Sequence, residues 1–74
     1  MTTTTTEAQA AELKILKAAY RRIHADNAHT QMGKRRLKEA GELLGRNADR
    51  VRECLGWARH HLPYAEALAI RARS

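Results

Sequence analysis

Apolar residues recur three or four positions apart through most of this 74-residue chain, which is the spacing of an α-helix. No segment alternates apolar and polar residues as a half-buried strand does. A chain of this length forms one domain and buries about 60% of its unfolded surface, so its stability is modest. The sequence therefore predicts an all-α fold, a small bundle of three to four helices.

Caps and helix-breaking residues divide the chain into segments. The Thr-rich tail, residues 1–6, is expected to be disordered, because a polar low-complexity tract cannot pack. A single helical domain, residues 7–74, is expected to follow. Its predicted helices span residues 7–25, 31–44, 48–61 and 63–71.

Particular residues set these boundaries. Thr30 is expected to cap the second helix, and Gly45 to end it in a left-handed conformation. Asn47 suits the N-cap of the third helix, with Asp49 in its first turn. Pro63 fits poorly inside a helix but suits the first position of a new one, so a separate final helix is predicted from this residue.

The predicted first helix carries an apolar arc that is broader than contact with one core requires. Leu13, Leu16, Tyr20 and Ile23 share one side, and Ile15 widens the arc. Such an arc indicates contacts on two sides. The second contact could be the chain's own last helix or another copy of the protein, and both remain open. If two copies pair, the expected dimer interface is Leu13, Leu16, Tyr20 and Ile23.

Positive charge is concentrated in one part of the chain. Fourteen Lys and Arg against eight Asp and Glu give a net charge of +6. Eight of the basic residues and four of the acidic ones lie between residues 34 and 60. A concentrated positive surface attracts polyanions through phosphate contacts and counterion release. The same charge also suits a merely solvated, Arg-rich surface.

Several classes of protein fit the sequence poorly. Cys54 is the single cysteine, which excludes an internal disulfide and fits a reducing compartment. No apolar run approaches the roughly 18 residues of a membrane helix, and no signal peptide is visible. No Gly-rich phosphate loop, serine nucleophile motif or pair of catalytic carboxylates is present, so no enzyme, cofactor or small-molecule substrate is expected.

Neither a metal site nor an extracellular setting is expected. Cys54 and His60 face opposite ways on the predicted third helix, and a zinc site wants four converging ligands. The expected location is cytoplasmic, in a bacterial nucleoid, phage or plasmid context.

The run EAGELLGRNADRVRECL, residues 39–55, resembles the helix-turn-helix of the factor-for-inversion-stimulation (Fis) type. That family has a small residue in its second helix, a Leu-Leu-Gly ending, and apolar residues six and ten positions after the glycine. Gly41, Leu43-Leu44-Gly45, Val51 and Leu55 occupy those places here. The resemblance covers about a quarter of the chain. It implies a DNA-binding domain that acts as a homodimer in gene regulation.

The match has departures. Arg46 stands where such turns usually carry an apolar residue, and Gly56 lies inside the proposed recognition helix. Gly41 is expected to let the second and third helices approach closely, because a side chain there would hold them apart. An ordinary helical hairpin with the same glycines is the alternative interpretation.

The recognition helix suggested by this resemblance is residues 48–61. With Val51 and Leu55 turned inward, its opposite face carries the expected base-reading residues Asp49, Arg52, Glu53, Gly56 and Arg59. The guanidinium of Arg52 is the best candidate for a base contact, because it can donate two hydrogen bonds to guanine O6 and N7. Phosphate contacts are expected from Lys34, Arg35, Arg36, Arg46, Asn47 and Arg50.

Trp57 is expected at the edge of the core rather than in a base-stacking role. Platforms that stack single strands normally present several aromatic side chains, and this chain has three that are scattered along the sequence.

Two functions from different classes follow. The first is a small sequence-specific double-stranded DNA-binding protein, a transcriptional repressor that acts as a homodimer. The second is a protein-binding adaptor or inhibitor, for example phage-encoded, that docks through the apolar face of the first helix. The first function needs the arginines of the third helix to be free to enter a groove, and internal ion pairs there would favour the second.

Overall fold

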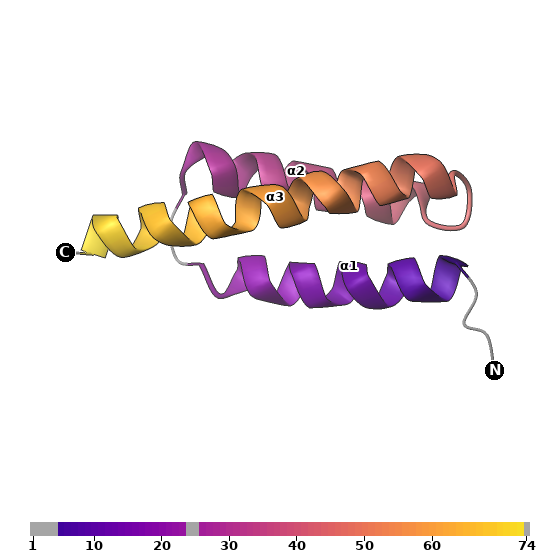
Figure 1. Cartoon of the computed structure of the whole chain (residues 1–74), viewed down its shortest axis with the longest axis horizontal. Coiled ribbons are helices and arrows are strands. Elements are labelled where there is room, and N and C mark those ends of the chain that lie inside the picture. Colours follow the sequence, from indigo (N-terminus) through magenta and orange to yellow (C-terminus); the bar gives the residue numbers. More distant parts are fainter. Residues whose placement is uncertain (1–4, 24–25, 74) are drawn as a thin grey trace.

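Three α-helices make up most of the part of the chain that the computed structural model describes, residues 5–23 and 26–73 (Figure 1). They are α1 (Thr5–Arg21), α2 (Ala28–Leu43) and α3 (Ala48–Arg73). The helices lie side by side in an elongated molecule of 46 × 22 × 15 Å. The all-α prediction is confirmed for these residues, which include no strand. None of their helices is long and apolar enough to cross a membrane.

A stripe of buried or half-buried side chains runs along each helix, with spacings that alternate between three and four residues. This average of about 3.5 residues keeps a stripe facing its neighbours along helices that lie nearly parallel or antiparallel. Together the three stripes form the core. They run through Gln9, Leu13, Leu16, Tyr20 and Ile23, then Thr30, Gly33, Leu37, Ala40 and Leu44, then Val51, Leu55, Ala58, Leu62, Ala65 and Ala69.

The broad apolar arc of α1 is covered by its own chain. α1 contacts both α2 and α3, and only Ile15 of the arc stays in solvent, with 68% of its surface exposed. The sequence suggested a dimer interface at four residues of this arc. These residues lie in the core of the single chain and are not available for such an interface: Leu13, Leu16, Tyr20 and Ile23. The arc is wide because α1 packs against two helices at once.

Tyr20 joins all three helices. It is 1% exposed, and its hydroxyl donates a hydrogen bond of 2.6 Å to the carbonyl oxygen of Ala58 in α3. On the way its ring passes against Gly33 of α2, where any Cβ would collide with the ring. A glycine at this position therefore leaves the space that the tyrosine ring needs to reach α3.

α1 and α2 both begin earlier than the sequence patterns suggest. α1 starts at Thr5, inside the predicted tail, and ends at Arg21; residues 1–4 of that tail and residues 24–25 of the predicted first helix lie outside the described residues. α2 starts at Ala28 because Asn27 is its N-cap and accepts a hydrogen bond of 2.9 Å from the backbone N–H of Thr30. Thr30, the expected cap, is instead fully buried within the first turns of α2.

Pro63 lies inside α3, so the predicted final helix from residue 63 is the second half of one 26-residue helix. Burial on both sides of the proline explains the continuity. Ala58 is 0% exposed before it, and Ala65 and Ala69 are 0% and 6% exposed after it. The Asn27 side chain also donates a hydrogen bond of 3.5 Å to the carbonyl oxygen of Ala65.

The turn between α2 and α3 has the residues that were expected. Gly45 has a φ of 81°, a backbone angle that residues other than glycine rarely adopt. Asn47 caps α3 and accepts a hydrogen bond of 3.1 Å from the backbone N–H of Arg50. The backbone N–H groups of Arg46 and Asn47 bond to the carbonyl oxygen of Leu43, which would otherwise lack a partner at the end of α2.

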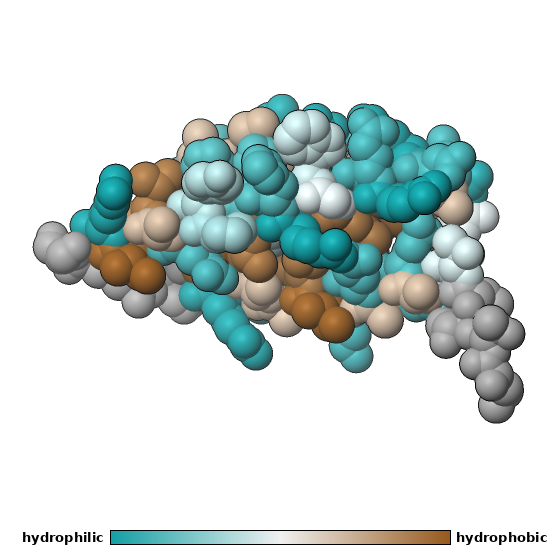
Figure 2. All heavy atoms as spheres, viewed as in Figure 1, coloured by the Kyte–Doolittle hydropathy of each residue, from teal (hydrophilic) through white to brown (hydrophobic). Residues whose placement is uncertain are grey.

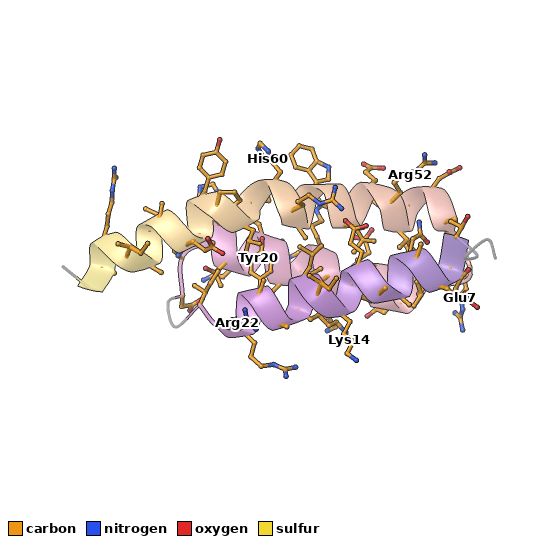
Figure 3. The ribbon with its side chains drawn as sticks, turned by 60° about the horizontal axis from the view of Figure 1, so that its bottom comes forward. Glu7, Lys14, Tyr20, Arg22, Arg52 and His60 are labelled. Atoms are coloured by element: carbon orange, nitrogen blue, oxygen red, sulfur yellow. The ribbon has the colours of Figure 1, made fainter. Side chains whose placement is uncertain are left out.

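α2 and α3 form an antiparallel hairpin. Near the turn Glu39 of α2 contacts Arg50 of α3, and at the far end His29 of α2 contacts His61 of α3 at 3.0 Å. Moving back along α2 from Glu39 to His29 therefore corresponds to moving forward along α3 from Arg50 to His61 by nearly the same number of residues. The two helices thus run antiparallel and side by side over this length (Figures 1 and 3). A helix-turn-helix instead joins helices at a steep angle. The helix-turn-helix prediction is therefore not confirmed, and the geometry matches the ordinary hairpin.

Gly41 does not lie between α2 and α3, as the resemblance suggested. A Cβ on Gly41 would lie 3.8 Å from Leu13 Cδ2 and 3.9 Å from Lys17 Nζ, both from α1. These are ordinary contact distances, so Gly41 is not needed for close approach of any helix pair.

Candidate nucleic-acid interface

The residues expected to read bases lie on the exposed side of α3. Asp49, Arg52, Glu53, Gly56 and Arg59 are all exposed. Figure 3 shows Arg52 and His60 pointing outward from α3, away from Tyr20 and the core. The orientation inferred from the helical periodicity is therefore present, although the helix that carries these residues is packed along α2.

The arginines of this face are held in ion pairs. Arg52 pairs with Asp49 at 2.6 Å, and Arg59 pairs with Glu12 of α1. Among the predicted base-reading residues, Asp49 and Glu53 balance the charges of Arg52 and Arg59. The formal charges of these five residues therefore sum to zero.

Two of the expected phosphate-binding arginines are held by Glu39: Arg50 pairs with it across the hairpin, and Arg36 pairs with it within α2. Arg50 contacts both Glu39 and Glu53, and Arg36 lies 3.7 Å from Glu39. Two hydrogen bonds lower the pKa of Glu39 below its usual value: the one from Arg50 has the larger effect, and the one from Cys54, at 3.2 Å, has the smaller. Burial is the main cause of the raised pKa of Cys54, and the hydrogen bond to Glu39 raises it further. This network fastens α2 to α3 beside the turn.

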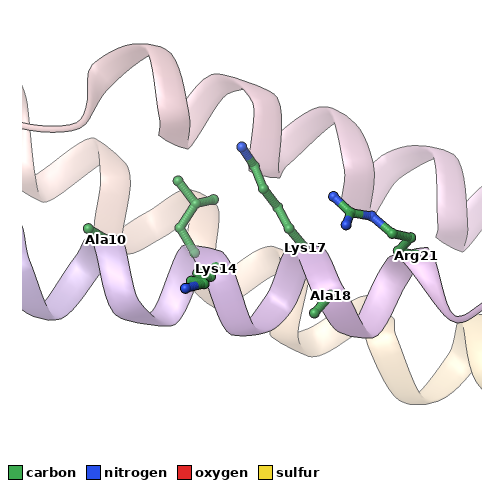
Figure 4. A pocket seen from close by; sticks show the side chains of 6 residues that line it. Ala10, Lys14, Lys17, Ala18 and Arg21 are labelled. Carbon is green, nitrogen blue, oxygen red and sulfur yellow. The ribbon is translucent and has the colours of Figure 1, made fainter.

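Unpaired cations gather along the groove between α1 and α2. A hollow of about 350 Å³ lies between α1 and α2, and a second of about 410 Å³, lined by α1 residues alone, adjoins it, because Lys17 and Arg21 line both. Apolar side chains of Leu13, Tyr20 and Leu37 contribute to their lining. No carboxylate lines either hollow, and within the described part of the chain none of the groove's cations makes an ion pair. The cation groove is defined by Lys14, Lys17, Arg21, Lys34 and Lys38. Figure 4 shows its three α1 cations, Lys14, Lys17 and Arg21.

The other expected phosphate contacts are divided between faces. Lys34 lies in the cation groove, whereas Arg35 and Arg46 are exposed outside it. Asn47 uses its side chain to cap α3. The groove's remaining cations were not among the expected contacts. The signal that could have found them is their helical spacing, three and four residues along α1 (Lys14, Lys17, Arg21) and four along α2 (Lys34, Lys38).

Aromatic and imidazole rings gather where α2 meets the middle of α3. The ring face is defined by His29, Trp57, His60, His61 and Tyr64, whose neighbouring ring centroids lie 5.2 to 6.0 Å apart. Trp57 is 45% exposed. Trp57 was expected at the edge of the core, but it is exposed and lies among rings from two helices that the fold brings together.

Other kinds of site are less well supported. Within residues 5–23 and 26–73, no three His, Cys, Asp or Glu side chains converge as a metal site would require. Outside the ring face, the exposed large apolar side chains are Ile15 on α1, Met32 on α2, and Leu68 and Ile70 toward the end of α3. On the face that Figure 2 shows, apolar surface is interrupted by polar surface. Comparisons with protein-family models, curated proteins and solved structures find no match to this chain.

Proposed function

We propose that the protein binds nucleic acid through its phosphate backbone, with the cation groove between α1 and α2 as the main contact surface. The observation that carries the proposal is that Lys14, Lys17, Arg21, Lys34 and Lys38 line two adjoining hollows and that no carboxylate lines either of them. Each cation that meets a phosphate releases condensed counterions, which supplies affinity without reading sequence. Double-stranded DNA is the ligand that the sequence suggested, and it supplies a regular row of phosphates.

Sequence-specific binding and repression form the finer part of the proposal, and they depend on α3. For Arg52 to donate to a base edge it must leave Asp49. The pair is 76% and 89% exposed, and such exposed pairs contribute about 0–1 kcal/mol, so a base or phosphate can replace the carboxylate at little cost. A repressor of this kind would read bases with the outer side of a hairpin helix rather than with a helix that projects from the body.

A homodimer would need a different interface from the one expected. Leu13, Leu16, Tyr20 and Ile23 are in the core, so pairing through them would require the bundle to open. The adaptor alternative loses its surface for the same reason. It was expected to dock through the apolar face of the first helix, and only Ile15 of that arc is exposed. The ion pairs of Arg52 and Arg59 meet the condition that the sequence analysis set against base reading by the third helix. Nucleic-acid binding is proposed instead from the unpaired cations of the cation groove.

Two adjacent arginines provide a matched test. Arg21 lines the cation groove, whereas Arg22 lines a different hollow, between α1 and the second half of α3. Arg21→Gln and Arg22→Gln remove the same charge from neighbouring positions. We expect Arg21→Gln to weaken binding to a DNA duplex and to lower the slope of log K against log[salt] by about 1, as the loss of one phosphate contact does. Arg22→Gln should leave that slope unchanged.

The measurement is fluorescence anisotropy of a labelled duplex at several salt concentrations. Equal effects of the two substitutions would show that general charge, and not the groove, attracts DNA. Arg52→Ala tests the finer part on a preferred and a random duplex. A loss confined to the preferred duplex supports base reading by α3, and equal losses contradict it.

A further inference from the structure

The ring face is built from two helices that are far apart in sequence. His29 comes from the first turn of α2, and the other four rings come from two successive turns of α3. Tyr64 stacks on His29 with centroids 5.2 Å apart and planes at 26°, and Trp57 stacks on His61 at 6.0 Å and 24°. His60 lies between Trp57 and Tyr64, at 5.8 and 5.5 Å. The rings thus form a continuous series along α3.

Much of this series is open to solvent. Trp57 and Tyr64 are 45% and 51% exposed, and His60 is exposed and points outward (Figure 3). His61 is the buried member, at 7%, and its hydrogen bond to His29 fixes the inner edge of the face. Exposed aromatic surface costs free energy in water, and a flat ring laid against it would recover that cost.

Cations connect the ring face to the cation groove across α2. At 100° per residue, the four basic residues of the run KRRLK, residues 34–38, spread over the exposed arc of α2. Lys34 and Lys38 line the groove on the α1 side. Arg36 lies on the α3 side, where it contacts Glu39 and acts electrostatically on His61. Arg35 is exposed.

We propose that the ring face stacks unpaired nucleobases of a strand whose phosphates contact the basic residues of α2. This inference rests on the proposed function and adds the ligand class, which is single-stranded or locally unpaired nucleic acid. Every base has a π-face, so a series of rings beside cations binds bases without reading their sequence. Aromatic rings about 5 to 6 Å apart along a helix offer successive bases separate stacking positions.

The chemistry of the face favours bases over an apolar protein segment. Three of its five rings are imidazoles, which are hydrated and polar at their edges. Met32 is the one large aliphatic side chain that is exposed on α2 among the described residues, whereas Ile15, Leu68 and Ile70 lie on α1 or near the end of α3. An apolar partner would be expected to use those side chains as well.

Trp57 is the only tryptophan in the chain, so its fluorescence reports on the ring face alone. Three probes separate the possibilities: an oligothymidylate of about 12 nucleotides, a blunt duplex of similar length, and inorganic polyphosphate, which has the charge but no bases. We expect the oligothymidylate to quench Trp57 at saturation. Polyphosphate should bind, as shown by its competition with labelled DNA, without comparable quenching.

Substitutions at Tyr64 test the stacking directly, because this side chain is half exposed and lies outside the core. Tyr64→Leu should weaken oligothymidylate binding by about 5-fold to 150-fold, the range for the loss of one stacked base, and leave duplex affinity unchanged. Tyr64→Phe keeps the ring and should bind as the wild type does. Circular dichroism checks that both variants keep their helices.

The two proposals fail in distinguishable ways. If the oligothymidylate binds in a manner that depends on Arg21 but neither quenches Trp57 nor responds to Tyr64→Leu, the ring-face proposal is wrong and the cation groove stands. If none of the three probes binds, both proposals are wrong. Quenching of Trp57 that depends on protein concentration in the absence of any probe would place a second copy on the ring face and overturn the proposal.

Discussion

Gly33 and Gly41 lie about two turns apart on α2, yet their surroundings are opposite. At Gly33 any Cβ would collide with the ring of Tyr20, whereas at Gly41 the nearest side-chain atom is 3.8 Å from a Cβ. Sequence reasoning assigned the close-packing role to Gly41 because the family resemblance pointed there. The role belongs to Gly33, and nothing in the local sequence shows that a tyrosine from another helix crosses it.

This difference predicts opposite effects of the same substitution. Gly33→Ala should lower the free energy of unfolding by about 1–2 kcal/mol, because the strain of overpacking exceeds the gain in helix propensity. Gly41→Ala should raise it by up to about 1 kcal/mol, because its methyl group meets only ordinary contacts. Urea denaturation of both variants checks the pair. Stabilisation by both substitutions would mean that Tyr20 does not pass over Gly33.

Tyr20 gives a second prediction at this scale, through its titration. Burial, followed by the nearby Glu66, raises the pKa of Tyr20 from 10.0 to about 12. Between pH 10 and 12 the folded protein therefore keeps the proton on the Tyr20 hydroxyl, whereas the unfolded chain releases it. The contribution of protonated Tyr20 to folding stability is full below pH 10 and is lost as the pH rises toward 12. Tyr20→Phe removes the contribution, together with the hydrogen bond to Ala58, which is worth about 1 kcal/mol at neutral pH.

We therefore expect wild type to be more stable than Tyr20→Phe at neutral pH and the gap to close as the pH rises from 10 to 12. Denaturation at a series of alkaline pH values measures the gap. Tyr64→Phe, at a half-exposed ring, is the control and should show no such convergence. A gap that stays constant with pH would contradict the assignment.

At the scale of the element, α3 shows how tertiary packing overrides a local signal. Pro63 lacks the N–H that would bond to the carbonyl oxygen of Arg59, which is why the sequence predicted a break. The three-and-four spacing of the core stripe nevertheless continues through the proline, from Ala58 to Leu62, Ala65 and Ala69. Sequence reasoning did not follow that spacing past the proline, because alanines carry the stripe there, and it predicted a separate helix instead.

Pro63→Ala distinguishes the two interpretations. In a continuous helix the substitution restores a backbone hydrogen bond and should raise the free energy of unfolding by about 1–3 kcal/mol, reduced somewhat by the greater freedom of the unfolded chain. At the first position of a separate helix proline is favourable, so its replacement would be neutral or destabilising. Urea denaturation gives the sign.

The far end of the α2–α3 hairpin is predicted to be sensitive to acid. Burial, followed by His29, His60 and Arg36, lowers the pKa of His61 below its ordinary value of 6.5. Below pH 6.5 the unfolded chain binds a proton at His61 more readily than the folded protein does. The contribution of neutral, buried His61 to folding stability is therefore full above pH 6.5 and is lost as the pH falls below it. His29 and His61 also share one hydrogen bond of 3.0 Å, which two protonated rings could not form.

His61→Gln should therefore make stability less dependent on pH just below 6.5. His60→Gln is the control, because His60 is exposed, although its ring lies 5.6 Å from that of His61 and its charge lowers the pKa of His61 to a lesser extent than burial does. Thermal denaturation from pH 7 downward compares the slopes. Identical slopes in wild type and His61→Gln would mean that other groups dominate the acid response.

At the scale of the whole molecule, the core is complete within one chain. Ile23 is 8% exposed and Ile15 is 68% exposed, although both belong to the broad apolar arc of the first helix. The arc's width indicated two contacts, but a sequence cannot say whether a second helix or a second copy supplies the other one. The answer depends on the positions of α2 and α3, which only the packed bundle fixes.

Ile23→Val and Ile15→Val form a matched pair for this point. Loss of one buried methylene at Ile23 should lower the free energy of unfolding by about 0.5–1.5 kcal/mol. The same change at Ile15 should alter it by less than about 0.5 kcal/mol. The unfolding midpoints should not change with protein concentration, because no subunit contact forms through this face. An unfolding midpoint that rises with protein concentration, and that Ile23→Val lowers but Ile15→Val does not, would instead support the dimer interface expected from the sequence.

The sequence alone determined the all-α class, the turn at Gly45 with its Asn47 cap, and the inward side of the first helix and of the third helix before Pro63. These features depend on helical periodicity and on the conformations open to single residues, which are local properties. Only the tertiary structure decided that α2 and α3 form a hairpin, that Arg52 and Arg59 are paired while the cations of the α1–α2 groove are not, and that five rings meet on one face. Each of these depends on which helices are neighbours and in what register, and that is settled by packing the three stripes together.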